Sequence, residues 1–175
     1  MLDLIEKRTS VPEIEKALKW AHEAGIWSYV NFITGMPYEA DADFEETLAF
    51  IRRNGGFIDD YQCGIFQPRP PSSFFYHPER FGNRLLEQVK YASRGTDDIA
   101  YEEVDGLGWE EKRQRNEMMR KAVYQALQEH TPLDVFVPVQ TLFHLYGSLG
   151  DKEQVRKWLK DNYRQALSRG IESTR

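Results

Sequence analysis

Two strand-like segments separated by one helix-length segment are the feature that most constrains this chain. Residues 26–34 are rich in β-branched and aromatic side chains and bulky on both faces, which is typical of a strand buried on both sides in a parallel sheet. Residues 57–66 predict a second strand, and residues 41–54 between them have the apolar spacing of a helix that ends at Gly55-Gly56. Because a strand, a helix and a strand in this order form a right-handed parallel crossover, we expect an α/β fold of the kind found in barrels and open sheets.

The segments that flank these strands carry clear start and stop signals. Ser10 and Glu13 have the spacing of a capping box, so we expect a helix to begin there and to end at Gly25. Residues 35–39 predict a turn after the first strand, and the proline-rich residues 67–73 predict a loop after the second. Both connections are therefore expected at the carboxyl ends of the strands, where α/β sheets place their ligands.

Beyond residue 73 the pattern changes from strands to helices. Residues 74–108 are aromatic and then polar and irregular, with a short helix expected at 83–92 and a weak strand at 99–104. The spacing of apolar residues then predicts three helices, at residues 109–130, 139–146 and 152–168. The C-terminal third of the chain is therefore expected to be helical.

A sheet of two parallel strands is not stable alone, and a strand as apolar as residues 26–34 cannot face water at an edge. Either the C-terminal part adds strands to this sheet, or protein outside this chain completes it. The second alternative predicts that the chain is part of a longer protein.

Composition excludes several classes of protein. The single cysteine, Cys63, cannot form an internal disulfide or supply the ligands of an iron–sulfur cluster, so a reducing, cytoplasmic setting is expected. A net charge of -5 argues against a nucleic-acid partner, which needs an excess of Lys and Arg. No apolar run approaches the length of a membrane span, so no membrane partner is expected.

Four motifs in a fixed order then suggest a family. They are Met1-Leu2-Asp3-Leu4-Ile5-Glu6-Lys7, Ala24-Gly25-Ile26, Ile33-Thr34-Gly35-Met36-Pro37-Tyr38-Glu39 and Asp43-Phe44-Glu45-Glu46-Thr47-Leu48-Ala49-Phe50. In this order and spacing the chain resembles the second half of a radical S-adenosylmethionine (radical SAM) barrel, where the third motif reads Gly-x-Pro-Gly-Glu-Thr. The chain departs from that motif at Tyr38 and Ala40, where the family has Gly and Thr. Pro71-Ser72-Ser73 is similar to the family's Pro-Gly-Thr loop, with Ser72 in place of Gly, and the chain lacks the family's Cys-x3-Cys-x2-Cys cluster motif.

The resemblance implies a domain organisation. Residues 1–75 would be the C-terminal portion of a partial TIM-like (β/α) barrel, residues 76–108 an irregular connector, and residues 109–175 a mainly α-helical extension. The long helical extension is most similar to that of the cobalamin-binding subgroup.

The resemblance also implies cofactors and partners. In the full-length parent, a 4Fe-4S cluster would reduce S-adenosylmethionine to a radical that attacks an unknown substrate, and cobalamin would be a further cofactor in the subgroup named. The residues implied at the cofactor are Asn31, Ile33, Thr34, Gly35, Pro37, Glu39, Gln67 and Arg69. This chain would need the upstream half of the barrel as its partner, would be inactive alone, and would tend to self-associate.

Other candidate groups favour structural roles. Asp59 and Asp60 are expected at the amino end of a strand in a solvated or capping role, and Cys63 as a buried, inert thiol. The basic residues 112–121 predict a solvated helical face, and the four histidines show no metal-ligand spacing.

Two other classes compete with the radical SAM hypothesis. A stand-alone interaction or adaptor module without catalysis is the alternative. An unrelated α/β enzyme has little support, because we find no nucleophile–base pair and no phosphate loop.

Overall fold

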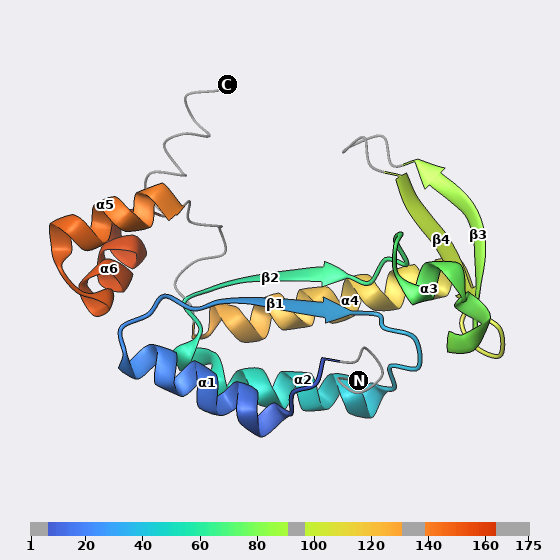
Figure 1. Cartoon of the computed structure of the whole chain (residues 1–175), viewed down its shortest axis with the longest axis horizontal. Helices are drawn as coiled ribbons and strands as arrows, with labels where there is room; N and C mark the ends of the chain where they lie inside the picture. Colours follow the sequence, from blue (N-terminus) through green and yellow to red (C-terminus); the bar gives the residue numbers. More distant parts are fainter. Residues whose placement is uncertain (1–6, 91–96, 131–138, 164–175) are drawn as a thin grey trace.

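The chain has a mixed α/β fold, seen in a computed structural model that describes residues 7–90, 97–130 and 139–163 (Figure 1). The first half contains α1 (Val11–Glu23), β1 (Tyr29–Thr34), α2 (Asp41–Asn54), the 3₁₀ turn η1 (Gly55–Phe57) and β2 (Asp60–Ile65). The second half contains α3 (Ser73–Tyr76), η2 (Pro78–Phe81), β3 (Asn83–Lys90), β4 (Asp97–Glu103), α4 (Trp109–Gln128), α5 (Val139–Leu149), α6 (Lys152–Trp158) and the single π turn η3 (Leu159–Tyr163).

The predicted strand–helix–strand unit is confirmed. Strands β1 and β2 pair in parallel, in a register that runs from Tyr29 opposite Asp60 to Thr34 opposite Ile65. Ahead of them, the Glu13 carboxylate accepts the backbone N–H of Ser10 at 2.7 Å, and Gly25 ends α1 with φ +71°. The motif at residues 1–7 lies almost entirely outside the described residues.

The core lies on one face of this sheet. Helices α1, α2 and α4 pack together against that face (Figure 1), and its buried side chains are Leu18, Leu48, Ile51, Ile58, Tyr61, Cys63, Val123 and Leu127. The prediction that β1 is buried on both sides is wrong for this chain, because Tyr29 is 39% and Ile33 52% exposed on the opposite face. The physical reason is that the described helices cover only the side of β1 that carries Val30 and Phe32.

The two edges of the sheet differ. The N–H groups of Asp60 and Phe66 donate to carbonyls of the first strand segment, so the alternate N–H groups of β2 point to its outer edge. Two of these are held by side chains, because Tyr61 N–H donates to Asp60 Oδ1 at 2.7 Å and Cys63 N–H to the hydroxyl of Tyr124 on α4 at 3.5 Å. The outer edge of β1 pairs with no strand in the described part of the chain.

The helix predicted at residues 83–92 is wrong over its described part, since residues 83–90 form β3. It pairs antiparallel with β4, which confirms the weak strand predicted at 99–104. Gly82 starts β3 from a left-handed conformation, and Arg84 pairs with Glu102 across the two strands. Cross-strand contacts of this kind override the local helix propensity of the sequence. The hairpin is a separate sheet, and neither described sheet closes into a barrel.

The predicted C-terminal helices are largely confirmed. Helix α4 spans most of residues 109–130, and α5 starts at Val139 as expected. Helix α6 is shorter than predicted and passes into η3; the remainder of the helix predicted to residue 168 lies outside the described residues. Within the described ranges, no helix is both long and apolar enough to cross a membrane.

Candidate functional site

The uncovered side of the parallel sheet is the first candidate surface, and we call it the open face. It consists of five residues that alternate along the two strands, namely Tyr29, Asn31 and Ile33 of β1 with Gln62 and Gly64 of β2. Tyr29 donates its hydroxyl to Gln62 Oε1 at 2.9 Å, and Asn31 lies directly opposite Gln62 in the register. A Cβ atom at Gly64 would meet nothing within 4 Å, so there is open space beside Ile33. Polar amides next to this open space make the face suited to a small polar ligand.

The predicted turn at residues 35–39 is built around a buried carboxylate. Glu39 Oε2 accepts the N–H groups of Gly35 at 2.6 Å and Met36 at 3.2 Å. Burial raises the pKa of Glu39, and the two backbone hydrogen bonds act in the opposite direction. The turn needs a left-handed backbone twice, at Gly35 with φ +79° and at Tyr38 with φ +61°. Glu39 therefore holds the shape of the turn.

This turn is covered by the C-terminal half of the same chain. The Asn116 side chain on α4 fills the space where a Cβ of Gly35 would stand, and Tyr101 on β4 donates its hydroxyl to the Gly35 carbonyl at 3.0 Å. Burial is also the main reason why the pKa of Tyr101 is raised. Arg115 of α4 donates to the Glu39 carbonyl at 3.1 Å. The Gly35 backbone is therefore in contact with protein, although a bare glycine suggested room for a ligand.

The eight residues implied as cofactor contacts thus fall into separate groups. Asn31 and Ile33 lie on the open face, while the four others on this strand and turn, Thr34, Gly35, Pro37 and Glu39, are buried. Gln67 and Arg69 follow the carboxyl end of β2; Gln67 accepts the Ile99 N–H at 3.3 Å, and Arg69 is exposed.

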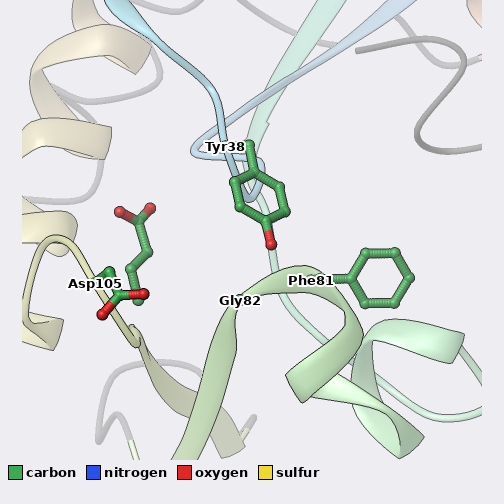
Figure 2. A pocket seen from close by; sticks show the side chains of 5 residues that line it. Tyr38, Phe81, Gly82 and Asp105 are labelled. Atoms are coloured by element: carbon green, nitrogen blue, oxygen red, sulfur yellow. The ribbon is translucent and has the colours of Figure 1, made fainter.

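A small pocket lies between the turn and the β3–β4 hairpin (Figure 2). Its volume is about 140 Å³, and it is lined by Tyr38, Phe81, Gly82, Glu103 and Asp105. Figure 2 shows the Tyr38 hydroxyl directed toward Gly82, with Asp105 and Phe81 on opposite sides. Because Glu103 is already paired with Lys112, the pocket offers few polar groups to a ligand.

Asp59 and Asp60 are buried, so a solvated role for this pair is wrong. Asp59 is 0% exposed and accepts the Ser28 N–H at 2.7 Å, with Lys152 Nζ at 2.8 Å and Arg156 Nη1 at 3.0 Å from its two carboxylate oxygens. These two cations come from α6, about a hundred residues away in sequence. Sequence spacing gave no signal of this cluster.

The prediction of a solvated basic face on α4 holds only in part. Arg113 pairs with Glu110 at 2.6 Å and Arg120 with Glu117 at 2.7 Å, as expected for neighbours on a helix. Lys112 is instead fully buried, where it pairs with Glu103 and lies 5.3 Å from the centre of the Tyr101 ring. The hairpin that buries Lys112 was itself predicted as irregular, so this contact was missed.

Cys63 is a buried thiol, as predicted. It is 3% exposed, and burial raises its pKa to about 12. Among the described residues, no group of three His, Cys, Asp or Glu side chains could hold a metal ion.

Comparisons with known proteins identify no similar protein. No protein-family model matches this sequence, and no curated protein or solved structure is significantly similar to it. Any assignment must therefore rest on the residues and geometry of the chain itself.

Proposed function

We propose that this chain is the C-terminal part of a radical SAM enzyme, namely a half-barrel followed by a mainly helical extension. The observation that carries the proposal is the sheet of β1 and β2, in which the described helices cover one face only and the outer edge of β1 pairs with no described strand. The substrate would be chosen by the complete protein.

The sheet geometry supports a barrel rather than a sandwich of helices. In a (β/α) barrel, each strand has helices outside and faces the barrel interior with its other side. Here α1, α2 and α4 occupy one side, and Tyr29, Asn31 and Ile33 stand on the other. The same three residues, by the alternation of parallel strands, direct their backbone groups to the outer edge of β1. Further strands added at that edge would extend the open face into a concave wall.

At the two positions of the turn where this chain departs from the family motif, the backbone still has the conformation that suits the family's residue. Tyr38 has the left-handed backbone that favours glycine, and the family has Gly there. Ala40 is the N-cap residue of α2, a position that favours the Thr of the family pattern. The Glu39 carboxylate in turn accepts the Gly35 and Met36 amides. The local structure of the turn therefore accounts for every specified residue of Gly-x-Pro-Gly-Glu-Thr except the Pro.

The three implied cofactors fit this chain differently. Asn31 and Gln62, beside the open space at Gly64, offer amide donors and acceptors to the nucleoside or amino-acid part of S-adenosylmethionine. When bound in a complete enzyme, S-adenosylmethionine supplies a 5′-deoxyadenosyl radical. A 4Fe-4S cluster does not fit, since Cys63 is the sole cysteine and is buried. No residue is assigned to cobalamin.

The proposal is tested first by titrating the chain with S-adenosylmethionine and recording backbone amide shifts by NMR. Shifts at Asn31, Ile33 and Gln62 in the wild type would support it if those at Ile33 and Gln62 disappear in Asn31→Leu. Gln125→Leu, at an exposed position of α4, is the control and should keep them. Absence of shifts at millimolar ligand would count against it. Reconstitution with iron and sulfide should give no stable cluster, and a well-formed cluster would contradict the proposal.

The coding sequence before the codon for Met1 gives an independent test. An in-frame Cys-x3-Cys-x2-Cys motif would support the proposal. An in-frame stop codon upstream of Met1, with no such motif between that stop codon and Met1, would refute it.

The covered turn favours a second candidate, a stand-alone interaction or adaptor module. Tyr101 and Asn116 seal the Gly35 backbone from within the chain, as a self-contained module requires. Light scattering and hydrogen exchange distinguish the two proposals. A monomer with a protected β1 favours the module, while self-association or an unprotected β1 favours the half-barrel.

A further inference from the structure

The ion pairs that join the helical pair α5–α6 to the rest of the molecule meet at one buried carboxylate. Asp59, at the amino end of β2, contacts Lys152 and Arg156 of α6, and we call these three residues the Asp59 cluster. All three are substantially buried, since the side chains of Asp59, Lys152 and Arg156 are 0%, 3% and 13% exposed. In Figure 1 the helical pair lies beyond the amino ends of β1 and β2.

The remaining contacts described for α5–α6 reach the loop between α1 and β1 and also η1, where Arg156 Nη1 donates to the Gly56 carbonyl at 3.0 Å. Tyr146 donates its hydroxyl to the Gly25 carbonyl at 3.2 Å, and Lys152 Nζ donates to the Ile26 carbonyl at 2.9 Å. Trp27 packs against the small apolar cluster formed by Val155 and Leu159. Apart from Trp27, the contacts described for this docking are polar.

We expect an interface of this composition to be lost when a single charged partner is removed. Buried ion pairs add little net stability, because desolvation offsets much of their attraction, but losing one partner leaves an uncompensated buried charge. The apolar cluster of α5–α6 is separate from the main core between α1, α2, α4 and the sheet. The helical pair can therefore leave without opening that core.

Asp59 also hydrogen-bonds to Ser28, the residue that precedes β1. Its carboxylate accepts the Ser28 N–H, and the Ser28 carbonyl accepts the N–H groups of Asp59 and Asp60, both at 3.1 Å. The next residue is Tyr29, the first of the open face. Loss of the Asp59 contacts would therefore remove hydrogen bonds that fix the first residues of β1.

We propose that the Asp59 cluster is a latch, which holds α5–α6 against the amino ends of the strands and whose closure orders the first residues of β1. When the latch opens, α5–α6 comes away as a unit and the Tyr29 end of the open face loosens, while the core between α2 and α4 stays folded. The inference does not depend on the proposed enzymatic role of the chain.

Hydrogen exchange of the full chain, followed by mass spectrometry, tests the latch with Asp59→Asn. We expect peptides over α6 and over residues 26–30 to exchange at least about 100-fold faster, with α2 unchanged. Asp105→Asn is the matched control, because it removes the same charge from an exposed carboxylate at the other end of the sheet and should change neither region.

Arg156→Gln, which removes one of the two cations, should give faster exchange at the same peptides by a smaller factor. Unchanged exchange in α6 would overturn the latch. Equal acceleration in α2 and α6 would also overturn it, since the helical pair and the core would then open together.

Discussion

The carboxylate of Glu39 lies 2.6 Å from the backbone N–H of Gly35, and this contact closes the turn that follows β1. We expect Glu39→Ala to lower the free energy of unfolding by about 1–3 kcal/mol, because two buried amides lose their acceptor. Glu39→Gln keeps an acceptor oxygen and should cost about 1 kcal/mol or less at neutral pH. Urea denaturation of the three proteins measures both effects, and equal losses would argue against this role.

The raised pKa of Glu39 predicts a pH dependence with a definite sign. A carboxyl whose pKa is higher in the folded state contributes stability below its ordinary value of 4.5, and this contribution is lost as the pH rises through the raised pKa. Wild-type protein should therefore lose stability relative to Glu39→Gln between pH 4.5 and neutrality. Thermal melts of both proteins across this range test the sign, and an opposite slope would be inconsistent with burial as the main cause.

Gly35→Ala should destabilise the fold by about 2–4 kcal/mol. The substitution meets a left-handed φ of +79° and the Asn116 side chain at once. In a double-mutant cycle, Asn116→Ala should recover part of the loss by removing the steric conflict, while the backbone strain remains. Gly56→Ala is the control, since a Cβ there meets nothing within 4 Å and should change stability by about 0.5 kcal/mol or less. Additive effects of Gly35→Ala and Asn116→Ala would contradict the close approach.

Tyr38 carries its left-handed backbone without the freedom of glycine. Its side chain is 60% exposed, so a replacement removes little buried surface. We expect Tyr38→Asn to be more stable than Tyr38→Val by about 1 kcal/mol, because Asn tolerates a positive φ and a β-branched residue does not. Chemical denaturation of both variants gives the difference, and a more stable Val variant would exclude backbone strain as the cause.

Cys63 should react with thiol reagents only when the chain unfolds. A pKa raised from 9.0 to about 12 lowers the thiolate fraction at pH 8 about a thousand-fold, and the side chain is 3% exposed. Modification by a disulfide reagent should therefore follow the unfolding rate as urea is added, with Cys63→Ser as the blank. Rapid labelling of the native protein would show that the thiol is accessible.

Local sequence signals predicted the elements that local physics controls. The helix that begins after Ser10 and ends near Gly25, the turn at residues 35–39 and the long helix starting at Trp109 follow from caps, glycines and apolar spacing. Residues 83–90 form a strand and not the predicted helix because they pair with β4, which no local pattern encodes. The same limit applies to Asp59, since its partners Lys152 and Arg156 are brought near only by the folded chain.

The candidate site was predictable only to the level of a strand end and its turn. Asn31 and Ile33 could be placed on one side of a strand by alternation, but which side would be uncovered depends on where α4 returns. The bare Gly35 suggested room for a ligand, whereas the residue that fills this space, Asn116, comes from α4, eighty-one positions later.

Because the Tyr124 hydroxyl accepts the Cys63 amide, the two edges of the β1–β2 sheet differ in how readily they can pair with a strand of another molecule. A protein with two receptive strand edges can add copies at both ends and grow into a fibre, as heterologous contacts that do not close commonly do. Here two N–H groups on the outer edge of β2 already donate to the side chains of Asp60 and Tyr124, so we expect strand pairing to favour the edge of β1. Two copies that pair through their β1 edges would form a closed dimer and not a fibre.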